Sequence, residues 1–263
     1  MNARAPRVYS TQAIVIGQRE FVEAAKVITI LTPDIGKQDS VAKGILKPKS
    51  RLAGHLEPGT YCDLELAVGK NLDIIREAQT ISRFRASQQN LMRLTTLVYV
   101  LELVDKYTVD GTGSDLFEPL LVTLKRLDIG ENLSAVVHGF ELMLLEITGF
   151  RPSLNQCVNC LSDVNSVQAN WSQDGGGIVC GQCVSLVPNT SLIEPKVLKV
   201  LRAYQSWPYE ESARITIDSY LEAQLSKIMH GLMKAFAERD IKSADLLEEV
   251  SWRKELPEGR VIS

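Results

Sequence analysis

The chain has 263 residues, of which 45% are hydrophobic and 23% charged, as in a globular protein of one large domain or two to three small ones. No apolar run approaches the roughly 20 residues that span a bilayer, and the N-terminal segment lacks the apolar core of a secretory signal. These features exclude a membrane protein and predict a cytoplasmic location. Residues 1–85 carry 13 Lys and Arg against 9 Asp and Glu, whereas residues 86–263 carry 16 against 23. The basic part could meet a polyanion, although chance alone can produce such a difference.

Residues 8–85 have the pattern of five short β-strands. Runs rich in β-branched residues, partly alternating in polarity, are separated by turn signals at residues 32–36, 57–59 and 69–71. Five antiparallel strands in so short a segment predict a small closed barrel, because closure removes exposed sheet edges. An OB-type barrel fits the number of strands, and an SH3-like barrel fits it nearly as well.

From about residue 86 the apolar period becomes helical. Apolar residues recur at spacings of three and four over residues 90–108, 133–148, 194–206 and 219–237. Asp115 and Glu118 mark the start of one further helix, because acids favour the positive end of the helix dipole.

Two C-x2-C pairs, Cys157 with Cys160 and Cys180 with Cys183, interrupt the helical part with 19 residues between them. Four thiolates at this spacing are typical of a tetrahedral zinc site, and a strand at 166–171 followed by a glycine turn predicts a ribbon. Disulfides are rare in cytosolic proteins, a thioredoxin-type pair would open a helix, and a catalytic zinc keeps an open position. We therefore expect one structural Zn²⁺, and we expect the fifth cysteine, Cys62, to be a small buried residue.

Together these patterns predict a multi-domain α+β fold. A small antiparallel β-barrel of the OB type occupies residues 1–85, and an α-helical domain occupies 86–263. The zinc ribbon is inserted in the helical domain at about 153–190.

No catalytic or nucleotide-binding motif is present in the sequence. Gly36-Lys37 and Gly69-Lys70 lack the Ser or Thr and the upstream glycine of a phosphate-binding loop, and no nucleophile elbow or H-E-x-x-H motif occurs. His138 and His230 fall within predicted helices, where a surface position or a hydrogen-bonded core position is expected. We therefore expect a protein that is not an enzyme and takes no nucleotide cofactor.

Residues 43–51, KGILKPKSR, hold Lys43, Lys47, Lys49 and Arg51 and no acid. Pro48 cannot continue a central strand, so the segment should leave the barrel as an extended, exposed loop that can approach phosphates. Arg19 and Lys37 could share its face. Few aromatic residues accompany the charge, which favours contact with the nucleic-acid backbone over base selectivity. A solvated loop of lysines without a ligand is the alternative.

Three stretches follow one another in a consistent order: VAKGILKPKSRLAGHLEPGT (41–60), FELMLLEITGFRPSLNQCVNC (140–160) and IKSADLL (241–247). Together they resemble the RecO family of bacterial recombination mediators. The resemblance implies an OB-fold that binds single- and double-stranded DNA, annealing of complementary strands, and contact with the acidic C-terminal tail of single-strand binding protein. It also implies action with RecR to load RecA, and no nucleotide hydrolysis. The DNA role would go to Lys43, Lys47, Lys49 and Arg51, with Arg19 and Lys37, and the zinc role to Cys157, Cys160, Cys180 and Cys183.

One position departs from the family pattern. Some relatives have basic residues immediately before the Phe-Glu of the helix that precedes the zinc ligands, whereas this chain has His138 and Gly139. Lys125, Arg126 and Arg151 are possible substitutes for binding an acidic tail.

The predicted function is that of a cytoplasmic, nucleoid-associated mediator of DNA repair and homologous recombination. An RNA-binding OB protein is one alternative. A zinc-stabilised protein scaffold whose basic loop is incidental is another.

Overall fold

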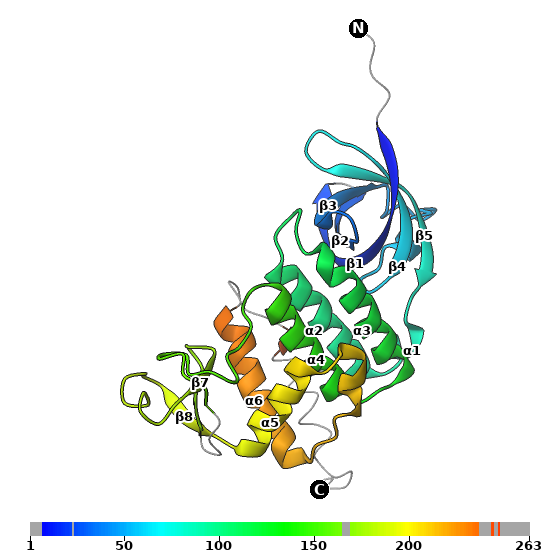
Figure 1. Ribbon diagram of the computed structural model, residues 1–263. Coiled ribbons are helices and arrows are strands. Elements are labelled where there is room, and N and C mark those ends of the chain that lie inside the picture. Colours follow the sequence, from blue (N-terminus) through cyan, green and yellow to red (C-terminus); the bar gives the residue numbers. More distant parts are fainter. Residues whose placement is uncertain (1–6, 23, 165–168, 237–242, 245–246, 248–263) are drawn as a thin grey trace, which may run out of the picture. The chain divides into compact units, whose positions relative to one another are not determined.

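The computed structural model describes residues 7–22, 24–164, 169–236, 243–244 and 247 (Figure 1). These residues fall into two compact units: one extends to Gly130 and includes Ser243 and Ala244, and the other begins at Glu131. No helix in the described ranges is long and apolar enough to cross a membrane.

A five-stranded closed barrel forms the first part of the first unit. Its strands are β1 (Val8–Val22), β2 (Ala25–Thr32), β3 (Gly36–Lys43), β4 (Tyr61–Ala67) and β5 (Asp73–Ser82). Their order around the barrel is β1-β2-β3-β5-β4. The OB-like barrel predicted from the alternating pattern is therefore confirmed, and each strand lies where that pattern placed it.

The pairing of β3 with β5 is parallel, over Ser40 with Asp73 and Val41 with Ile74, whereas the other four strand pairs are antiparallel. The sequence pattern predicted antiparallel strands throughout. Parallel neighbours need a crossover connection, and here the chain passes through the basic loop and β4 before it returns as β5.

The barrel interior is filled by alternate side chains of its strands, including Ala13, Val15, Ile28, Leu64 and Ile75. In β1 the intervening residues Ile14 and Ile16 are buried as well, because the outer face of this strand contacts a helix. A strand that is buried on both faces has an uninterrupted apolar sequence, and residues 13–16 of β1 have the sequence AIVI.

Between the barrel and Gly130, the first unit contains the helices α1 (Arg85–Gln88), α2 (Leu91–Tyr107) and α3 (Phe117–Ile129). The Asn90 side chain caps α2 by accepting from the backbone N–H of Arg93, and Gly130, with a φ of 81°, ends α3. Short 3₁₀ turns lie at Ala53–His55 and Ser114–Leu116.

The second unit combines three helices with a small sheet. The helices are α4 (Leu133–Ile147), α5 (Pro195–Ser206) and α6 (Ser219–Phe236), and a 3₁₀ helix spans Tyr209–Arg214. The sheet has the order β7-β6-β8, from β6 (Ala169–Ser172), β7 (Gly177–Val179) and β8 (Thr190–Ile193). The predicted strand at 166–171 lies partly outside the described residues.

The first compact unit extends beyond residue 85, because it includes α2 and α3 together with the barrel. A boundary between barrel and helical domain at residue 85 stays a prediction.

Candidate nucleic-acid interface and metal centre

The basic loop, residues 43–51, folds as two successive turns. β3 ends at Lys43, and Gly44 adopts a φ of 71°, which favours glycine. Lys47 then donates its backbone N–H to the Gly44 carbonyl, and Ser50 donates to the carbonyl of Lys47. The extended segment predicted from Pro48 is thus wrong in detail, because consecutive turns compact the loop.

The loop is anchored by apolar side chains and presents its cations outward. Ile45 is buried in the barrel core, and Leu52 packs against the same core. Lys43, Lys47, Lys49 and Arg51 are all exposed. None of these four side chains forms a hydrogen bond or an ion pair with any other described residue. Four cations without internal partners on an anchored loop can bind a polyanion with little ordering cost.

Lys37 is placed differently from the loop cations. Its ammonium contacts the Asp105 carboxylate at 2.7 Å, and it donates to the carbonyls of Asp105 and Thr108 at the end of α2. Only 14% of its side chain is exposed. These contacts support a structural role, in which a cation stabilises the negative end of a helix, rather than contact with DNA.

Arg19 lies on β1 with 56% of its side chain exposed and pairs with Asp39. Asp39 also accepts from the Thr29 hydroxyl, which holds its carboxylate in place. The ion pair with Asp39 partly neutralises the charge of Arg19. A phosphate would have to compete with this carboxylate.

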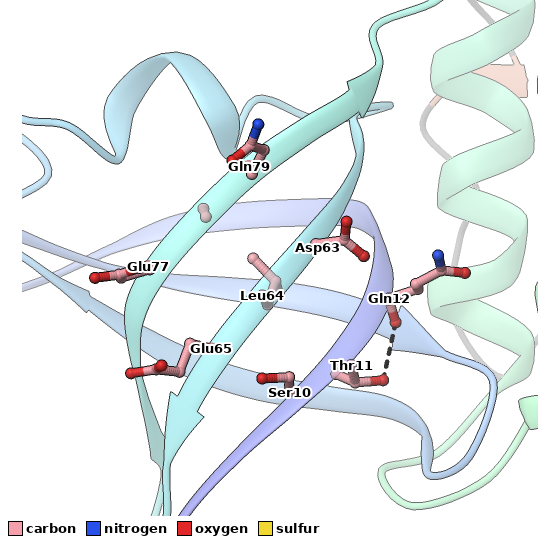
Figure 2. Close-up of a pocket in the computed structure, with 9 residues that line it drawn as sticks. Ser10, Thr11, Gln12, Asp63, Leu64, Glu65, Glu77 and Gln79 are labelled. Atoms are coloured by element: carbon pink, nitrogen blue, oxygen red, sulfur yellow. Dashed lines mark hydrogen bonds between the residues drawn. The ribbon is translucent and has the colours of Figure 1, made fainter.

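A hollow of about 460 Å³ on the outer face of β1, β4 and β5 has the opposite charge (Figure 2). Its lining includes Asp63, Glu65 and Glu77, and the last two face each other across the β4–β5 ladder. Arg76 offsets only part of this charge, at 3.8 Å from Glu65. The negative charges of these carboxylates repel the phosphates of a nucleic-acid backbone, so this face of the barrel is unsuited to DNA.

The four cysteines of the two C-x2-C pairs converge on one point of the second unit. Their sulfur atoms all lie within 4.8 Å of one another, and Cys160 Sγ is 3.8 Å from Cys180 Sγ. Zn–S bonds of about 2.3 Å in a tetrahedron place sulfurs about 3.8 Å apart. All four cysteines are free thiols, so the sequence prediction that they form one cluster is confirmed, and the donor set fits zinc.

Hydrogen bonds to sulfur prepare the thiols for a cation. The backbone N–H of Cys180 donates to Cys157 Sγ, and the Asn159 amide donates to Cys183 Sγ. Burial disfavours the Cys157 thiolate, but hydrogen bonds from the backbone of Cys160, Cys180 and Asn159 outweigh it and lower its pKa to about 6.

Cys183 behaves oppositely. The amide of Asn159 favours its thiolate, yet hydrogen bonding with Cys180 together with burial raises its pKa to about 12. Four thiolates cannot share this volume without a compensating charge, and a divalent cation supplies it.

A third strand of the ribbon, β8, was missed by the sequence interpretation. It pairs with β6 over Ala169 to Ser172. Its sequence, TSLI, is four residues long, and so short a segment carries no periodic signal distinguishable from a loop.

The three cations considered for an acidic tail differ in exposure. Lys125 is exposed on α3, whereas the neighbouring Arg126 is only 5% exposed. Arg151 belongs to the second unit and pairs with Glu146 at 2.9 Å. Of the three, Lys125 alone is both exposed and without a contact to another described residue.

His138 and Gly139, which replace the basic residues of some relatives, face the interior of the second unit. His138 is 6% exposed, and a Cβ on Gly139 would lie 2.7 Å from Ser212 Oγ. A long basic side chain could not occupy position 139 without displacing the side chains of Tyr209 and Ser212.

Comparison with known proteins covers nearly the whole chain. Residues 7–84 match the family model "Recombination protein O N terminal", and residues 88–245 match "Recombination protein O C terminal". A protein named DNA repair protein RecO from Roseiflexus sp. strain RS-1 is 34% identical over 245 residues, covering 93% of this chain and 86% of the relative. Proteins of the same name from Heliobacterium modesticaldum and Dehalococcoides mccartyi are 31% and 30% identical, over 93% and 94% of this chain and 90% and 97% of their own lengths. The resemblance predicted from the motifs is confirmed.

Proposed function

Because this chain belongs to the RecO family, we propose that it is a DNA repair and homologous recombination mediator. It binds single- and double-stranded DNA, anneals complementary strands and, with RecR, helps to load RecA on DNA coated by single-strand binding protein. It acts in the cytoplasm on the nucleoid.

The observation that carries this proposal is the basic loop. Lys43, Lys47, Lys49 and Arg51 are exposed, and their side chains have no partners among the described residues. Each cation that neutralises a phosphate releases a counterion, so backbone binding of this kind is strong at low salt and weak at high salt. The compact turns and the anchor Ile45 hold the four charges on one short segment.

Annealing by this surface needs no active site. Two complementary strands repel each other through their phosphates, and a surface that neutralises part of that charge lowers the repulsion while the bases stay free to pair. The absence of aromatic residues from the loop sequence suits this role, because stacking would hold bases away from their partners. We accordingly propose that the protein is not an enzyme and uses no nucleotide cofactor.

Zinc has a structural role in this proposal. Cys157, Cys160, Cys180 and Cys183 would hold one Zn²⁺ through four thiolates, which leaves no open position for a substrate. The ion would join two knuckles of the second unit that are otherwise linked by short strands.

The acidic tail of single-strand binding protein is the proposed protein ligand of the helical part. Lys125 is the best placed of the cations considered, since Arg126 is buried and Arg151 is paired with Glu146. RecR is the second proposed partner.

The test replaces Lys43, Lys47, Lys49 and Arg51 together by alanine. Four contacts to single-stranded DNA give a slope of log K against log salt of about −3, and we expect the variant to lose that contribution together with most of its annealing activity. Fluorescence anisotropy with a labelled oligonucleotide over a range of salt measures both affinity and slope.

A charge-matched control replaces the exposed lysines 196, 199, 227 and 234 of α5 and α6, and it should retain the wild-type slope. If the loop variant bound and annealed DNA like the wild type, the basic loop would be incidental and the scaffold alternative would hold. Preference for RNA in a competition between matched oligonucleotides would instead favour the RNA-binding alternative.

A further inference from the structure

A depression lined by two arginines lies in the first unit, where β5 leads into α1. It has a volume of about 500 Å³, and its lining includes Thr80, Ser82, Arg83 and Arg85. The two guanidinium groups and the Ser82 hydroxyl are donors of the kind that bind phosphate oxygens, whereas the Thr80 hydroxyl contacts His55 Nδ1 at 2.8 Å. None of these residues belongs to the basic loop.

Arg83 has an unsatisfied donor. Its Nε is buried and has no hydrogen-bond partner in the described part of the molecule. A buried donor without an acceptor costs free energy, and such groups in folded proteins usually have an acceptor that is missing from the structure. An anion in the depression would supply one once the Arg83 side chain turns toward it.

The backbone between the two arginines is held in an uncommon conformation. Phe84 has a φ of 48° and is 4% exposed, so its ring anchors a left-handed turn that costs a non-glycine residue free energy. Arg85 follows directly, exposed and without a hydrogen bond or ion pair to any residue that the structure describes. The turn thus fixes two cations on either side of a buried aromatic ring.

The acid in the lining does not neutralise this charge. Asp128 contributes to the depression, but its Oδ1 accepts the backbone N–H of Ser87 at 3.0 Å. It forms no ion pair with either arginine among the described contacts. Two cations against one hydrogen-bonded carboxylate leave a net positive site.

The segment that follows the basic loop lies beside two residues of the depression. His55 Nδ1 accepts the backbone N–H of Thr80 at 3.0 Å, which fixes the 3₁₀ turn Ala53–His55 against the end of β5. A guanidinium nitrogen of Arg83 lies 3.6 Å from the position that a Cβ on Gly54 would occupy. Arg51 lies three residues before Gly54, so the cations of the loop lead through this turn to Arg83 and Arg85.

We propose that Arg83 and Arg85 form a second phosphate subsite, which extends the path of single-stranded DNA from the basic loop to the junction of β5 and α1. This inference rests on the proposed function. A strand held by the loop would place a phosphate over the depression, where Arg83 Nε gains its missing acceptor and Arg85 adds a second charge.

The experiment measures oligonucleotide affinity and salt slope for R85Q and for R83Q/R85Q. Loss of two contacts to single-stranded DNA reduces the slope by about 1.4, and we expect about a tenfold loss of affinity for the double variant near 0.1 M salt. R85Q, at an exposed position, should show about half the change in slope without affecting the fold. Restoration of charge in R83K/R85K should recover most of the slope.

The controls are R76Q and K70Q/R76Q, which remove exposed cations of β5 and of the β4–β5 turn, and they should leave slope and affinity unchanged. Equal losses in controls and test variants would overturn the subsite, because affinity would then follow net charge alone. The subsite would also be overturned if R85Q and R83Q/R85Q bound like the wild type while the fourfold loop variant lost binding, and the proposed function would stand. A loop variant with wild-type affinity would instead overturn the proposed function.

Discussion

His138 shows how a single side chain can connect two helices. It lies on α4, and its Nδ1 and Nε2 contact Glu141 Oε2 at 2.8 Å and Glu222 Oε1 of α6 at 2.9 Å. Both ring nitrogens face carboxylate acceptors, so both must donate, and the ring must carry a proton on each. Burial alone would lower the pKa of His138, but hydrogen bonds to Glu141 and Glu222 outweigh it and raise the pKa to about 10. Of the two positions expected for this histidine, surface or hydrogen-bonded core, the structure shows the core position. Its two carboxylate partners could not be inferred from the sequence.

Replacement of His138 by glutamine should destabilise the protein in a pH-dependent way. Because the folded pKa lies above the unfolded value of about 6.5, the stabilisation is fully present below that value and is lost as pH rises toward 10. At pH 7 we expect H138Q to lower the free energy of unfolding by about 3–5 kcal/mol, since it leaves buried carboxylates without their cation. Urea unfolding at pH 6, 8 and 10 measures the difference, which should shrink with pH. A difference that is constant across this range would refute the charged pair.

Lys37 acts at the same scale in the first unit. It joins β3 to the last turn of α2 through Asp105 and Thr108, and the adjacent Gly36 allows the approach, because a Cβ there would lie 2.0 Å from the Thr112 carbonyl oxygen. We expect Lys37→Met to cost about 2 kcal/mol of stability and to leave the salt slope of DNA binding unchanged. Chemical denaturation and anisotropy separate these effects, and a reduced slope would return Lys37 to the DNA surface.

At the scale of elements, we expect the proposed zinc ion to stabilise the small sheet and its two knuckles. Its three strands are three or four residues long, and strands this short are marginal alone. The knuckles expose Leu161 and Leu186 at 71% and 69%, whereas Trp171, Ile178 and Val179 of the strands are buried.

Replacement of Cys160 or Cys180 by serine should therefore lower the zinc content below one ion per chain and destabilise the protein by about 3–5 kcal/mol, because metal binding is coupled to folding. Metal analysis and thermal unfolding with and without chelator measure both effects. C62S is the matched control, since Cys62 belongs to β4 and is not one of the four clustered cysteines, and burial raises its pKa to about 12. It should keep the full zinc content. A cysteine variant that stayed folded but lost DNA binding would contradict a purely structural role for zinc.

At the scale of the whole molecule, charge is divided between the parts of the chain. The barrel segment carries the positive excess and the remainder the negative excess. Within the barrel, the acidic lining of the hollow would keep bound DNA on the side of the basic loop (Figure 2). DNA and an acidic peptide tail would compete for the same cations if both bound the loop, which favours separate sites.

Strand annealing tests this separation. We expect the protein to anneal complementary strands coated with intact single-strand binding protein at least tenfold faster than strands coated with a tail-less form, because the tail recruits it. Annealing of naked strands, which carry neither form, does not depend on the tail and serves as the reference. Lys125→Glu should reduce annealing of coated strands alone, by reversing the charge that attracts the tail. An equal effect on naked strands would place Lys125 in the DNA surface.

The sequence by itself determined whatever depends on neighbours along the chain. Polarity alternation placed the five barrel strands, the apolar period of three to four placed α2, α4, α5 and α6, and the spacing of Cys157, Cys160, Cys180 and Cys183 predicted their cluster. Each is a local pattern, because a strand, a helix or a knuckle is built from residues close in sequence.

Only the tertiary structure decided which charges are available. Lys37 contacts Asp105, 68 residues away, His138 contacts Glu222, 84 residues away, and Arg126 is buried in α3. Arg83 and Arg85, in contrast, line a depression and form no ion pair among the described contacts. A basic side chain is available to a ligand unless the fold places a carboxylate or a carbonyl group beside it. Long-range contacts set that pairing, and no local pattern encodes them.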